Sequence, residues 1–412
     1  MCPDVFDRSK PITETQLLVP ENDATDPILS IVIPALNEEI SISQFIDWCH
    51  EGIQAAGIAA EIIIIDSSND RTPDIALAKG ARVIRTPKRG LGQAYIDSLP
   101  FIRGKWLLLG DADCTYDFRK ITPFIEKFQE GYEYIMGSRV KGSVEPGSRP
   151  PLHQYFGAPV TNWALNMIHG THFSDIHCGM RGITLDAFRR MHLQSKGWSY
   201  APEMVLKSVL LELKTTEVPI HFLKEPEGRI SHLAQRGGWV EPWKAGWASL
   251  QVTFTYGASA FLLWPGILLA LPGLLLMLLT ALGSRQVGNV QLDLHFLFLG
   301  VSTFLIGSAS MYMGILAKMV NDLHGRHIAR WASVFTFNRS VKASAFTIMV
   351  GLVLDVLLVH RYVQNGYVLS SQDEQVSHLA IFGLGMIAIG CLTFGFTLLV
   401  NALIKRLQYR PI

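Results

Sequence analysis

Short apolar runs alternate with amphipathic stretches between residues 29 and 136. Runs typical of β-strands cover 29–33, 61–65, 81–85, 105–109 and 132–136. Between them, apolar positions recur with the 3.6-residue helical period over 41–56, 72–79, 90–101 and 118–128. Strands that are apolar throughout and are separated by helices favour a mostly parallel sheet covered on both faces. The pattern therefore predicts a Rossmann-like α/β domain.

The last third of the chain has a different pattern. Four long apolar stretches cover residues 255–282, 294–317, 344–363 and 378–403, and each is long enough to span a bilayer. Buried helices of a soluble domain are the alternative, but four such runs in succession favour a membrane. We therefore expect a C-terminal α-helical transmembrane domain.

These patterns divide the 412 residues into more than one structural unit, as the length also suggests. Residues 1–27 are polar and broken by prolines, which indicates a flexible leader. Trp239, Trp243 and Trp247 are spaced four apart and would line one side of a helix, as an interfacial belt or by core packing. The predicted division is a leader (1–27), an α/β domain (28–235), an amphipathic juxtamembrane connector (236–254), four membrane spans (255–404) and a basic tail (405–412).

Charge indicates orientation. The formal net charge of +1 gives no basic field, so nucleic acid is not an expected partner. All cations after residue 317 except Arg361 gather between the second and third spans and in the tail, and the positive-inside rule expects both segments in the cytoplasm. They are Lys318, Arg326, Arg330, Arg339, Lys342, Lys405, Arg406 and Arg410.

The compartment follows from two further observations. The N-terminus lacks a signal-peptide pattern, and the five cysteines lack disulfide or metal-ligand spacing, which fits a reducing compartment. We expect an integral membrane protein with four spans, whose α/β domain and both termini lie on the cytoplasmic side.

The strongest chemical signal is Asp111-Ala112-Asp113, directly after the apolar strand. Two carboxylates at a strand end can share a hard cation, Mg²⁺ or Mn²⁺, that would bridge the phosphates of a donor. A solvated carboxylate pair is the alternative for this motif alone. Asn37 and Asp66 follow two other strands, so the same sheet edge should carry all four side chains.

Several further motifs stand in order along the chain. They are IVIPALNEE (31–39), IIIIDSSNDRT (62–72), GLGQAY (90–95), GSR (137–139), DIHCGMR (175–181), VPI (218–220) and GRIS (228–231). With them, residues 29–233 resemble glycosyltransferase family 2, and within it the dolichol-phosphate mannose synthase-like and bacterial polyprenyl-phosphate glycosyltransferases. The resemblance implies a GT-A-like domain that transfers a hexose from a nucleotide-sugar donor to a polyprenyl phosphate, with anomeric inversion, for cell-envelope glycan or glycoprotein assembly.

The resemblance also implies roles for single residues. The catalytic residues would be Asp113, Arg139 and Arg229, with the two arginines beside phosphates, although a surface salt bridge is the alternative for each. The metal ligands would be Asp111 and Asp113. The substrate-binding residues would be Pro34, Leu36, Asn37, Glu38, Asp66, Asp111, Ala112 and Ser231.

Three positions depart from the family pattern. Ile65 precedes Asp66 where the family usually has a second acid, so base recognition can differ. Thr115 stands where a glutamine metal ligand is common, which puts metal affinity from that side in doubt. Gln154 replaces a common arginine, for which Arg149 is a candidate substitute.

Three other polar residues have open roles. His177 and Cys178 lack partner ligands at metal spacing, so we expect structural roles. Glu203 lies where relatives that act on alcohols place a general base. A phosphate acceptor is already ionised and needs no base, so for Glu203 a structural role and a catalytic role both stay open.

Two other functions compete with this one. A processive polysaccharide synthase or lipid-alcohol glycosyltransferase typically has a QxxRW motif, which QRGGW (235–239) and HIARW (327–331) both miss. A non-enzymatic flippase or transporter would be favoured by intramembrane charges, but Asp355 is nearly alone in the four spans. The expected partners are the donor, the lipid acceptor and the bilayer, and a homo-oligomer is left open.

Overall fold

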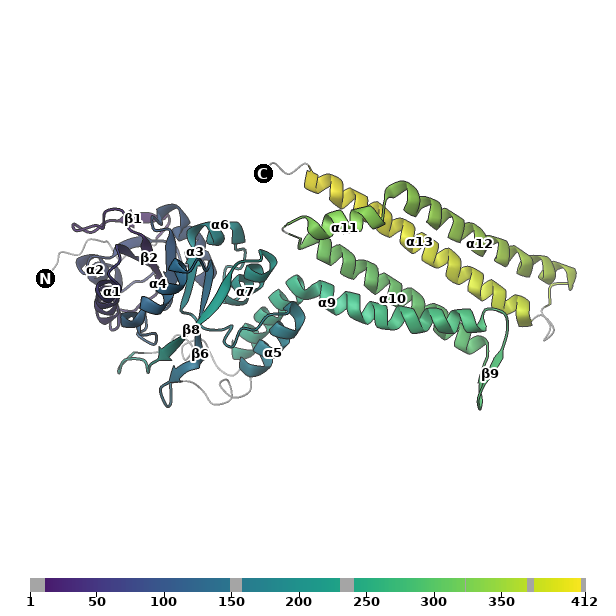
Figure 1. The fold of residues 1–412 in the computed structure, drawn as a ribbon, viewed down its shortest axis with the longest axis horizontal. Coiled ribbons are helices and arrows are strands. Elements are labelled where there is room, and N and C mark those ends of the chain that lie inside the picture. The colour runs from purple at the N-terminus through teal and green to yellow at the C-terminus, as the bar shows by residue number, and fades with distance from the viewer. Residues whose placement is uncertain (1–11, 149–157, 230–240, 323, 369–373, 409–412) are drawn as a thin grey trace. The chain divides into compact units, whose positions relative to one another are not determined.

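The computed structural model describes residues 12–148, 158–229, 241–322, 324–368 and 374–408. The chain forms two compact units, Met1–Thr255 and Tyr256–Ile412, which are described separately (Figure 1). The boundary confirms an α/β domain followed by a helical one.

An eight-stranded mixed sheet organises the first unit, in the order β1-β4-β3-β2-β5-β7-β6-β8. Parallel pairing joins β2 to β3 and β5, β3 to β4, and β6 to β8, while β1–β4, β5–β7 and β6–β7 are antiparallel. The strands are β1 (Gln16–Leu18), β2 (Leu29–Ala35), β3 (Ala60–Asp66), β4 (Arg82–Arg85), β5 (Trp106–Leu109), β6 (Tyr134–Val144), β7 (Arg181–Thr184) and β8 (Thr215–Phe222).

Helices cover both faces of this sheet. Ile31, Val32 and Ile33 are all fully buried, and since neighbouring residues of a strand point to opposite faces, neither face of β2 is open to solvent. The helices are α1 (Ile42–Ala56), α2 (Thr72–Ala78), α3 (Leu91–Ser98), α4 (Thr122–Gln129), α5 (Ala158–His169), α6 (Leu185–Met191) and α7 (Tyr200–Leu210), with 3₁₀ turns at η1 (Leu99–Phe101) and η2 (Phe118–Lys120).

These elements confirm the predicted fold and correct some of its details. All five predicted strands form, and β6 continues to Val144. The helix expected over 118–128 forms as two separate elements. Asp117 caps η2 by accepting the Arg119 N–H, and α4 begins at Thr122 with Pro123 in its first turn. Strands β7 and β8 were not predicted.

The prediction of a flexible leader over residues 1–27 is wrong for part of that segment. Gln16–Leu18 form edge strand β1, with Gln16 opposite Arg85 of β4. Asp23 accepts hydrogen bonds of 2.9 and 2.8 Å from the Arg103 guanidinium. A three-residue strand is too short for a periodicity, so ladder bonds and an ion pair, rather than an apolar pattern, fix this segment. Residues 1–11 lie outside the described residues.

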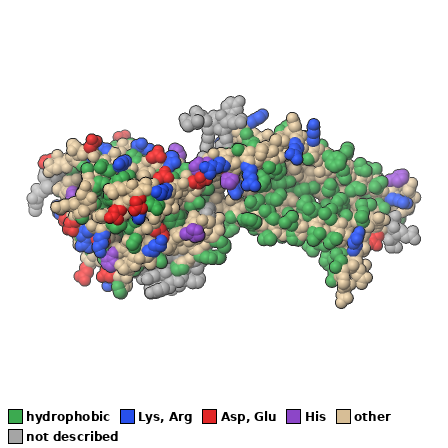
Figure 2. All heavy atoms as spheres, in the orientation of Figure 1, with side chains coloured by type: hydrophobic (Ala, Val, Ile, Leu, Met, Phe, Trp, Pro, Cys, Tyr) green, Lys and Arg blue, Asp and Glu red, His purple; other side chains and the backbone are tan. Residues whose placement is uncertain are grey.

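The second unit holds four helices that are long and apolar enough to cross a membrane, over Leu250–Thr280, Leu294–Val320, Phe337–Gln364 and Glu374–Arg406. These match the four predicted spans. They belong to α9 (Glu241–Thr280), α10 (Leu294–Val320), α12 (Phe337–Gln364) and α13 (Glu374–Gln408), accompanied by the short helix α11 (Arg326–Val334) and the hairpin β9 (Arg285–Val287) and β10 (Val290–Leu292). On the face drawn in Figure 2, hydrophobic side chains cover most of the surface of these helices. The length and apolar composition of these helices identify the chain as an integral membrane protein.

Glycines let these helices approach backbone to backbone. A Cβ on Gly307 of α10 would lie 2.3 Å from the Ala270 nitrogen of α9, and one on Gly300 would lie 2.7 Å from the Met277 nitrogen. A Cβ on Gly351 of α12 would lie 2.5 Å from the carbonyl of Gly383 in α13. Small residues at such crossings allow the close van der Waals packing that associates helices in lipid.

The predicted connector is not a separate element where it is described. From Glu241 it forms the first part of α9, which continues into the first span. Trp247 is exposed, the side chain of Trp243 is not described, and Trp239 lies outside the described residues. The interfacial belt stays a prediction.

Candidate active site

Three turns meet at the carboxyl edge of the central parallel strands. Ala35 of β2 pairs with Asp66 of β3, and Val32 pairs with Leu109 of β5. The turn with Asn37 and the turn with the DxD sequence therefore leave the sheet at one edge, as the sequence predicted.

Asp113 is oriented by the residue that departs from the family pattern. Its Oδ1 accepts hydrogen bonds from the Thr115 N–H at 3.0 Å and from the Thr115 hydroxyl at 2.6 Å. Cys114, between them, has a φ of +59° in the left-handed region, which a non-glycine residue rarely adopts. Thr115 thus holds Oδ1 of Asp113 and makes no hydrogen bond to Oδ2.

Asp111 packs against the backbone of a distant loop. A Cβ on Gly179 would lie 2.7 Å from Asp111 Oδ2, so this close approach requires glycine. The Gly179 N–H donates to the Tyr116 hydroxyl at 2.7 Å, which fixes the loop. Burial, and then repulsion by Asp113, raises the pKa of Asp111, against the attraction of Arg139 and Arg229.

The two carboxylates are the candidate ligands of a shared cation. Burial also raises the pKa of Asp113, so the pair carries negative charge that the surrounding groups do not fully stabilise. Among the described residues, no cluster of three or more His, Cys, Asp or Glu side chains could hold a metal. A cation here would take two protein carboxylates and fill its remaining positions with phosphate oxygens and water, as Mg²⁺ usually does.

Arg229 joins the first turn to the DxD turn. Its Nε and Nη2 donate to the two Glu38 carboxylate oxygens at 2.7 and 2.5 Å. Its Nη1 lies 3.9 Å from Asp113 Oδ2 and 2.9 Å from a Glu225 oxygen, and its side chain is only 8% exposed. Arg229 is thus a buried cation between three carboxylates and not a surface salt bridge. Ser231 lies outside the described residues.

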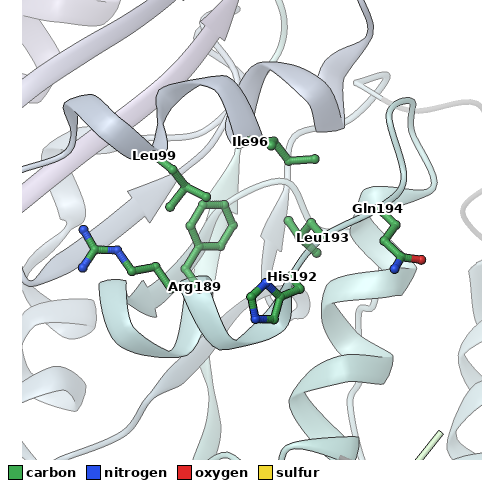
Figure 3. Close-up of a pocket in the computed structure, with 7 residues that line it drawn as sticks. Ile96, Leu99, Arg189, His192, Leu193 and Gln194 are labelled. Atoms are coloured by element: carbon green, nitrogen blue, oxygen red, sulfur yellow. The ribbon is translucent and has the colours of Figure 1, made fainter. Parts of the chain in front are cut away.

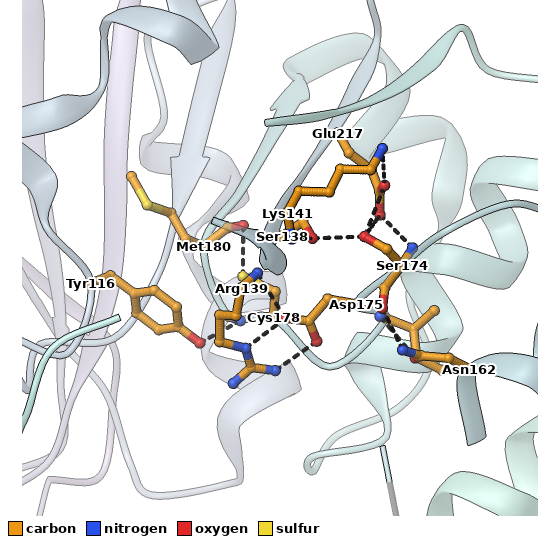
Figure 4. Close-up of polar contacts among 12 residues, drawn as sticks. Tyr116, Ser138, Arg139, Lys141, Asn162, Ser174, Asp175, Cys178, Met180 and Glu217 are labelled. Atoms are coloured by element: carbon orange, nitrogen blue, oxygen red, sulfur yellow. Dashed lines mark hydrogen bonds and ion pairs between the residues drawn. The ribbon is translucent and has the colours of Figure 1, made fainter. Parts of the chain in front are cut away.

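Arg139 is also buried, but it has its own counter-ion. Its Nε and Nη2 donate to the Asp175 oxygens at 2.6 and 2.8 Å, and its backbone N–H donates to the same carboxylate at 3.1 Å (Figure 4). Asn162 of α5 braces this loop by donating to the Ser174 carbonyl at 2.6 Å. Each predicted arginine thus forms a fork with one carboxylate, and Arg229 in addition lies 3.9 Å from Oδ2 of Asp113 in the DxD sequence.

Asn37 and Glu38 tie the first turn to the second. The Asn37 N–H donates to the Ser68 hydroxyl at 2.7 Å, and Asn37 Oδ1 accepts the Asn69 N–H at 3.0 Å. The Glu38 N–H donates to the Thr72 hydroxyl at 2.9 Å. Asn37 is exposed and has a φ of +55°, so it presents the tip of the turn to solvent.

The other predicted substrate-binding residues are more enclosed. Pro34 and Leu36 are half-buried and Ala112 is buried. Asp66 is fully buried, with Oδ1 accepting the Ser68 N–H at 3.2 Å and Oδ2 lying 3.4 Å from Arg85 Nη1. Burial raises the pKa of Asp66 to about 6. The carboxylate thus lies beneath the turn rather than on its surface.

Glu203 is occupied by structural contacts. It is fully buried, and its two oxygens accept the Gln194 and Ser195 N–H groups at 2.9 and 2.8 Å. Lys207 Nζ lies 2.6 Å from Oε1. Burial by itself would raise the pKa of Glu203, but these partners lower it. This geometry favours the structural role.

Cys178 has the expected structural surroundings. It is fully buried, and burial raises the pKa of its thiol to about 12. Its Sγ donates to the Met180 carbonyl at 3.6 Å.

Arg181 was in a predicted motif but received no role. It is fully buried and donates to the carbonyls of Cys178 at 2.7 Å, Ile176 at 2.9 Å and Ala201 at 2.7 Å. It thereby shapes the loop that carries Gly179 against Asp111. The signal that could have identified it is the arginine at the end of the motif, at the start of an apolar strand.

A cavity of about 300 Å³ lies between α3 and α6 and is also bounded by the segment that follows α6 (Figure 3). It is lined by Ile96, Leu99, Phe188, Arg189, His192, Leu193 and Gln194. None of the predicted site residues lines it.

Comparison with known proteins identifies the family. Residues 30–195 match glycosyl transferase family 2, and residues 321–404 match the glycosyltransferase family 2 C-terminal transmembrane region. The low-salt glycan biosynthesis hexosyltransferase Agl6 of Haloferax volcanii is 31% identical over 357 residues, which cover 85% of this chain and 84% of that protein. The dolichyl-phosphate hexose transferase of the same organism is 27% identical over 201 residues, covering 47% of this chain and 82% of that protein.

Solved structures resemble the first unit more distantly. Glucosyl-3-phosphoglycerate synthase from Mycobacterium tuberculosis, in complex with Mn²⁺, uridine-diphosphate-glucose and phosphoglyceric acid, is 19% identical. The match covers 56% of this chain and 80% of that one, with a TM-score of 0.43. The extent of the match to Agl6, together with the two family regions, shows that the chain belongs to glycosyltransferase family 2 and is a glycosyltransferase with a C-terminal transmembrane region.

Proposed function

We propose that the protein transfers a hexose from a nucleotide sugar to a polyprenyl phosphate at the cytoplasmic leaflet, with inversion at the anomeric carbon. The observation that carries this proposal is the convergence of Asp111, Asp113 and Arg229 at one sheet edge in a chain with four membrane-spanning helices. The product would serve cell-envelope glycan or glycoprotein assembly. The relatives of this chain include a dolichyl-phosphate hexose transferase and a glycan biosynthesis hexosyltransferase, which supports a polyprenyl phosphate as the acceptor.

The donor site would be built from the three turns. Pro34, Leu36, Asn37 and Glu38 supply the first turn, and Asp66 supports it from below. Asp111 and Asp113 would hold Mg²⁺ or Mn²⁺, which neutralises the charge that develops on the nucleoside diphosphate.

The acceptor chemistry follows from charge. A phosphate monoester is largely ionised near neutral pH, so its oxygen can attack the anomeric carbon without a general base. Arg229 would hold negative charge on the reacting phosphates, since a buried guanidinium beside Asp113 is preorganised to do so. Glu203 already accepts two backbone N–H groups and pairs with Lys207, which supports a mechanism without that base.

The alternative acceptors gain no support from the described residues. The segment 327–331, which misses the QxxRW motif, lies in α11, where Trp331 packs against the helix core of the second unit. Residues 235–239 lie outside the described residues.

The test is transfer by the purified full chain. A panel of nucleotide sugars is incubated with polyprenyl phosphate and with the matching prenyl alcohol, and glycolipid is scored. We expect product from the phosphate alone, loss of product with chelator, recovery with Mg²⁺ or Mn²⁺, and a near-inactive Asp113→Asn variant. Asp47→Asn, at an exposed ion pair with Lys79, is the matched control. Full activity of Asp113→Asn in excess chelator, or equal use of the alcohol, would contradict the proposal.

A further inference from the structure

The short helix α11 lies at the end of the membrane unit where α10 ends and α12 begins. Its apolar side packs inward, where Ile328, Trp331 and the following Phe335 contact a core of Ile315 and Met319 from α10 with Phe396 and Val400 from α13. Asn321, just after α10, donates to the Tyr256 carbonyl at 3.3 Å, so the first span starts at this same end.

Aromatic stacking and a cap fix the position of α11. Phe396 stacks on Tyr312 with ring centroids 4.4 Å apart, and Phe335 meets Phe396 edge to face at 4.8 Å. At the start of the helix, Asp322 Oδ2 accepts the Ile328 N–H at 2.8 Å. Side-chain packing thus holds α11 against α10 and α13, and this packing fixes which side of the helix faces outward.

The outer side of α11 and the adjoining helix ends are cationic. Arg326 and Arg330 lie one turn apart on α11 and are exposed. We define the α11 cationic surface as the exposed side chains of Arg326, Arg330, Arg339, Lys342, Lys405 and Arg406.

Little negative charge balances this surface. The one acid in residues 318–342 and 401–408 is Asp322, whose two oxygens accept the backbone N–H groups of His324 and Ile328. Within the part of the chain that the structure describes, Arg330, Arg339, Lys342, Lys405 and Arg406 form no ion pair. Unpaired cations at the end of membrane spans are complementary to the phosphates of anionic lipids.

We propose that the α11 cationic surface binds the phosphate headgroups of anionic phospholipids in the leaflet at this end of the spans. Orientation by positive charge would need only cations near the spans. It would not need an amphipathic helix whose aromatic side is packed into the helix core while its arginines face outward. That fixed arrangement points to a headgroup-binding surface.

The test measures lipid binding by the full chain purified in a neutral detergent. Binding of phosphatidylglycerol and of phosphatidylcholine is compared by native mass spectrometry and by titration with a fluorescent lipid. We expect preferential binding of phosphatidylglycerol that weakens with salt. Arg330→Ala with Arg339→Ala should weaken it by about 30-fold, since each cation near an anionic surface contributes about 1 kcal/mol.

Two variants keep the outcome interpretable. Arg285→Ala with Arg361→Ala removes two exposed cations at the opposite ends of the spans and should leave binding unchanged. Arg330→Lys with Arg339→Lys should restore most of the binding, which a misfolded variant could not do. Equal binding of phosphatidylcholine, equal loss in the control variant, full competition by inorganic phosphate, or binding of polyprenyl phosphate without phosphatidylglycerol would each overturn the proposal.

Discussion

At the scale of single residues, the candidate site holds two buried arginines, each paired with a carboxylate. Arg229 is held by Glu38 and lies 3.9 Å from Asp113, while Arg139 is held by Asp175. Burying a cation costs desolvation free energy. Binding the negative charge of a ligand beside the cation would offset that cost.

Arg229→Ala should therefore lower kcat/KM by about 30-fold to 1,000-fold, as loss of about 2 to 4 kcal/mol of preorganised charge stabilisation does. Steady-state transfer to polyprenyl phosphate measures it. Arg119→Ala, which removes an exposed arginine paired with Asp117, is the control and should change little. If Arg229→Ala is tolerated while Glu203→Gln abolishes turnover, the base-free mechanism is wrong.

Asp66 allows a prediction about pH. Burial raises its pKa from 3.8 to about 6, so the folded state binds this proton more tightly than the unfolded chain does. The contribution of protonated Asp66 to the free energy of unfolding is complete below about pH 3.8 and is lost as the pH rises through about 6. Asp66→Asn should therefore raise the unfolding temperature of the first unit at pH 8 and raise it less at pH 5.

Thermal unfolding of the purified chain at both pH values checks this, with the exposed Asp47→Asn as control. Weaker donor binding by the more stable Asp66→Asn variant would show that the acid is retained for function. An equal shift at both pH values would refute the linkage.

At the scale of elements, glycines determine how closely the membrane helices pack. In α10, a Cβ on Gly307 would meet the Ala270 backbone at 2.3 Å, whereas in α13 a Cβ on Gly395 would meet nothing within 4 Å. The two positions make a matched pair, because both are helical glycines in membrane spans.

Gly307→Ala should separate α9 from α10 and lower the unfolding temperature of the second unit. Gly395→Ala should be neutral or stabilising, since alanine is favoured over glycine in a helix by about 1 kcal/mol. Thermal unfolding in one detergent compares them, and equal behaviour of the two variants would mean that the close crossing does not limit stability.

At the scale of the whole molecule, the distribution of charge predicts the orientation of the spans. All cations after residue 317 except Arg361 gather at the ends of α10, α11, α12 and α13 that carry the α11 cationic surface. The β9–β10 hairpin lies between the first two spans on the other side. We therefore expect the catalytic unit and both termini in the cytoplasm.

Labelling with a membrane-impermeant thiol reagent on intact cells tests this orientation. A cysteine at Gly288, in the exposed hairpin turn, should be labelled from outside, and one at Ala329 in α11 should not. The unsubstituted chain reports the background from its native cysteines. The reverse pattern would invert the topology.

The sequence by itself determined the features that arise from local pattern. Strands β2, β3 and β5 are largely apolar on both faces, and the spans are long apolar runs, so each is recognisable without knowledge of its neighbours. Because parallel strands end at one edge, the meeting of Asn37, Asp66 and Asp111 also followed from the sequence.

Only the tertiary structure decided which polar groups pair. Arg229 and Glu38 are 191 residues apart, and Arg139 and Asp175 are 36 apart. Thr115, which looked like a lost metal ligand, proved to hold Asp113. Strand β7 has four residues and pairs antiparallel with both neighbours, which no local period encodes. Periodicity reports only whether a side chain faces a core or solvent, whereas the partner of a charged group depends on which distant segments the fold brings within a few ångströms.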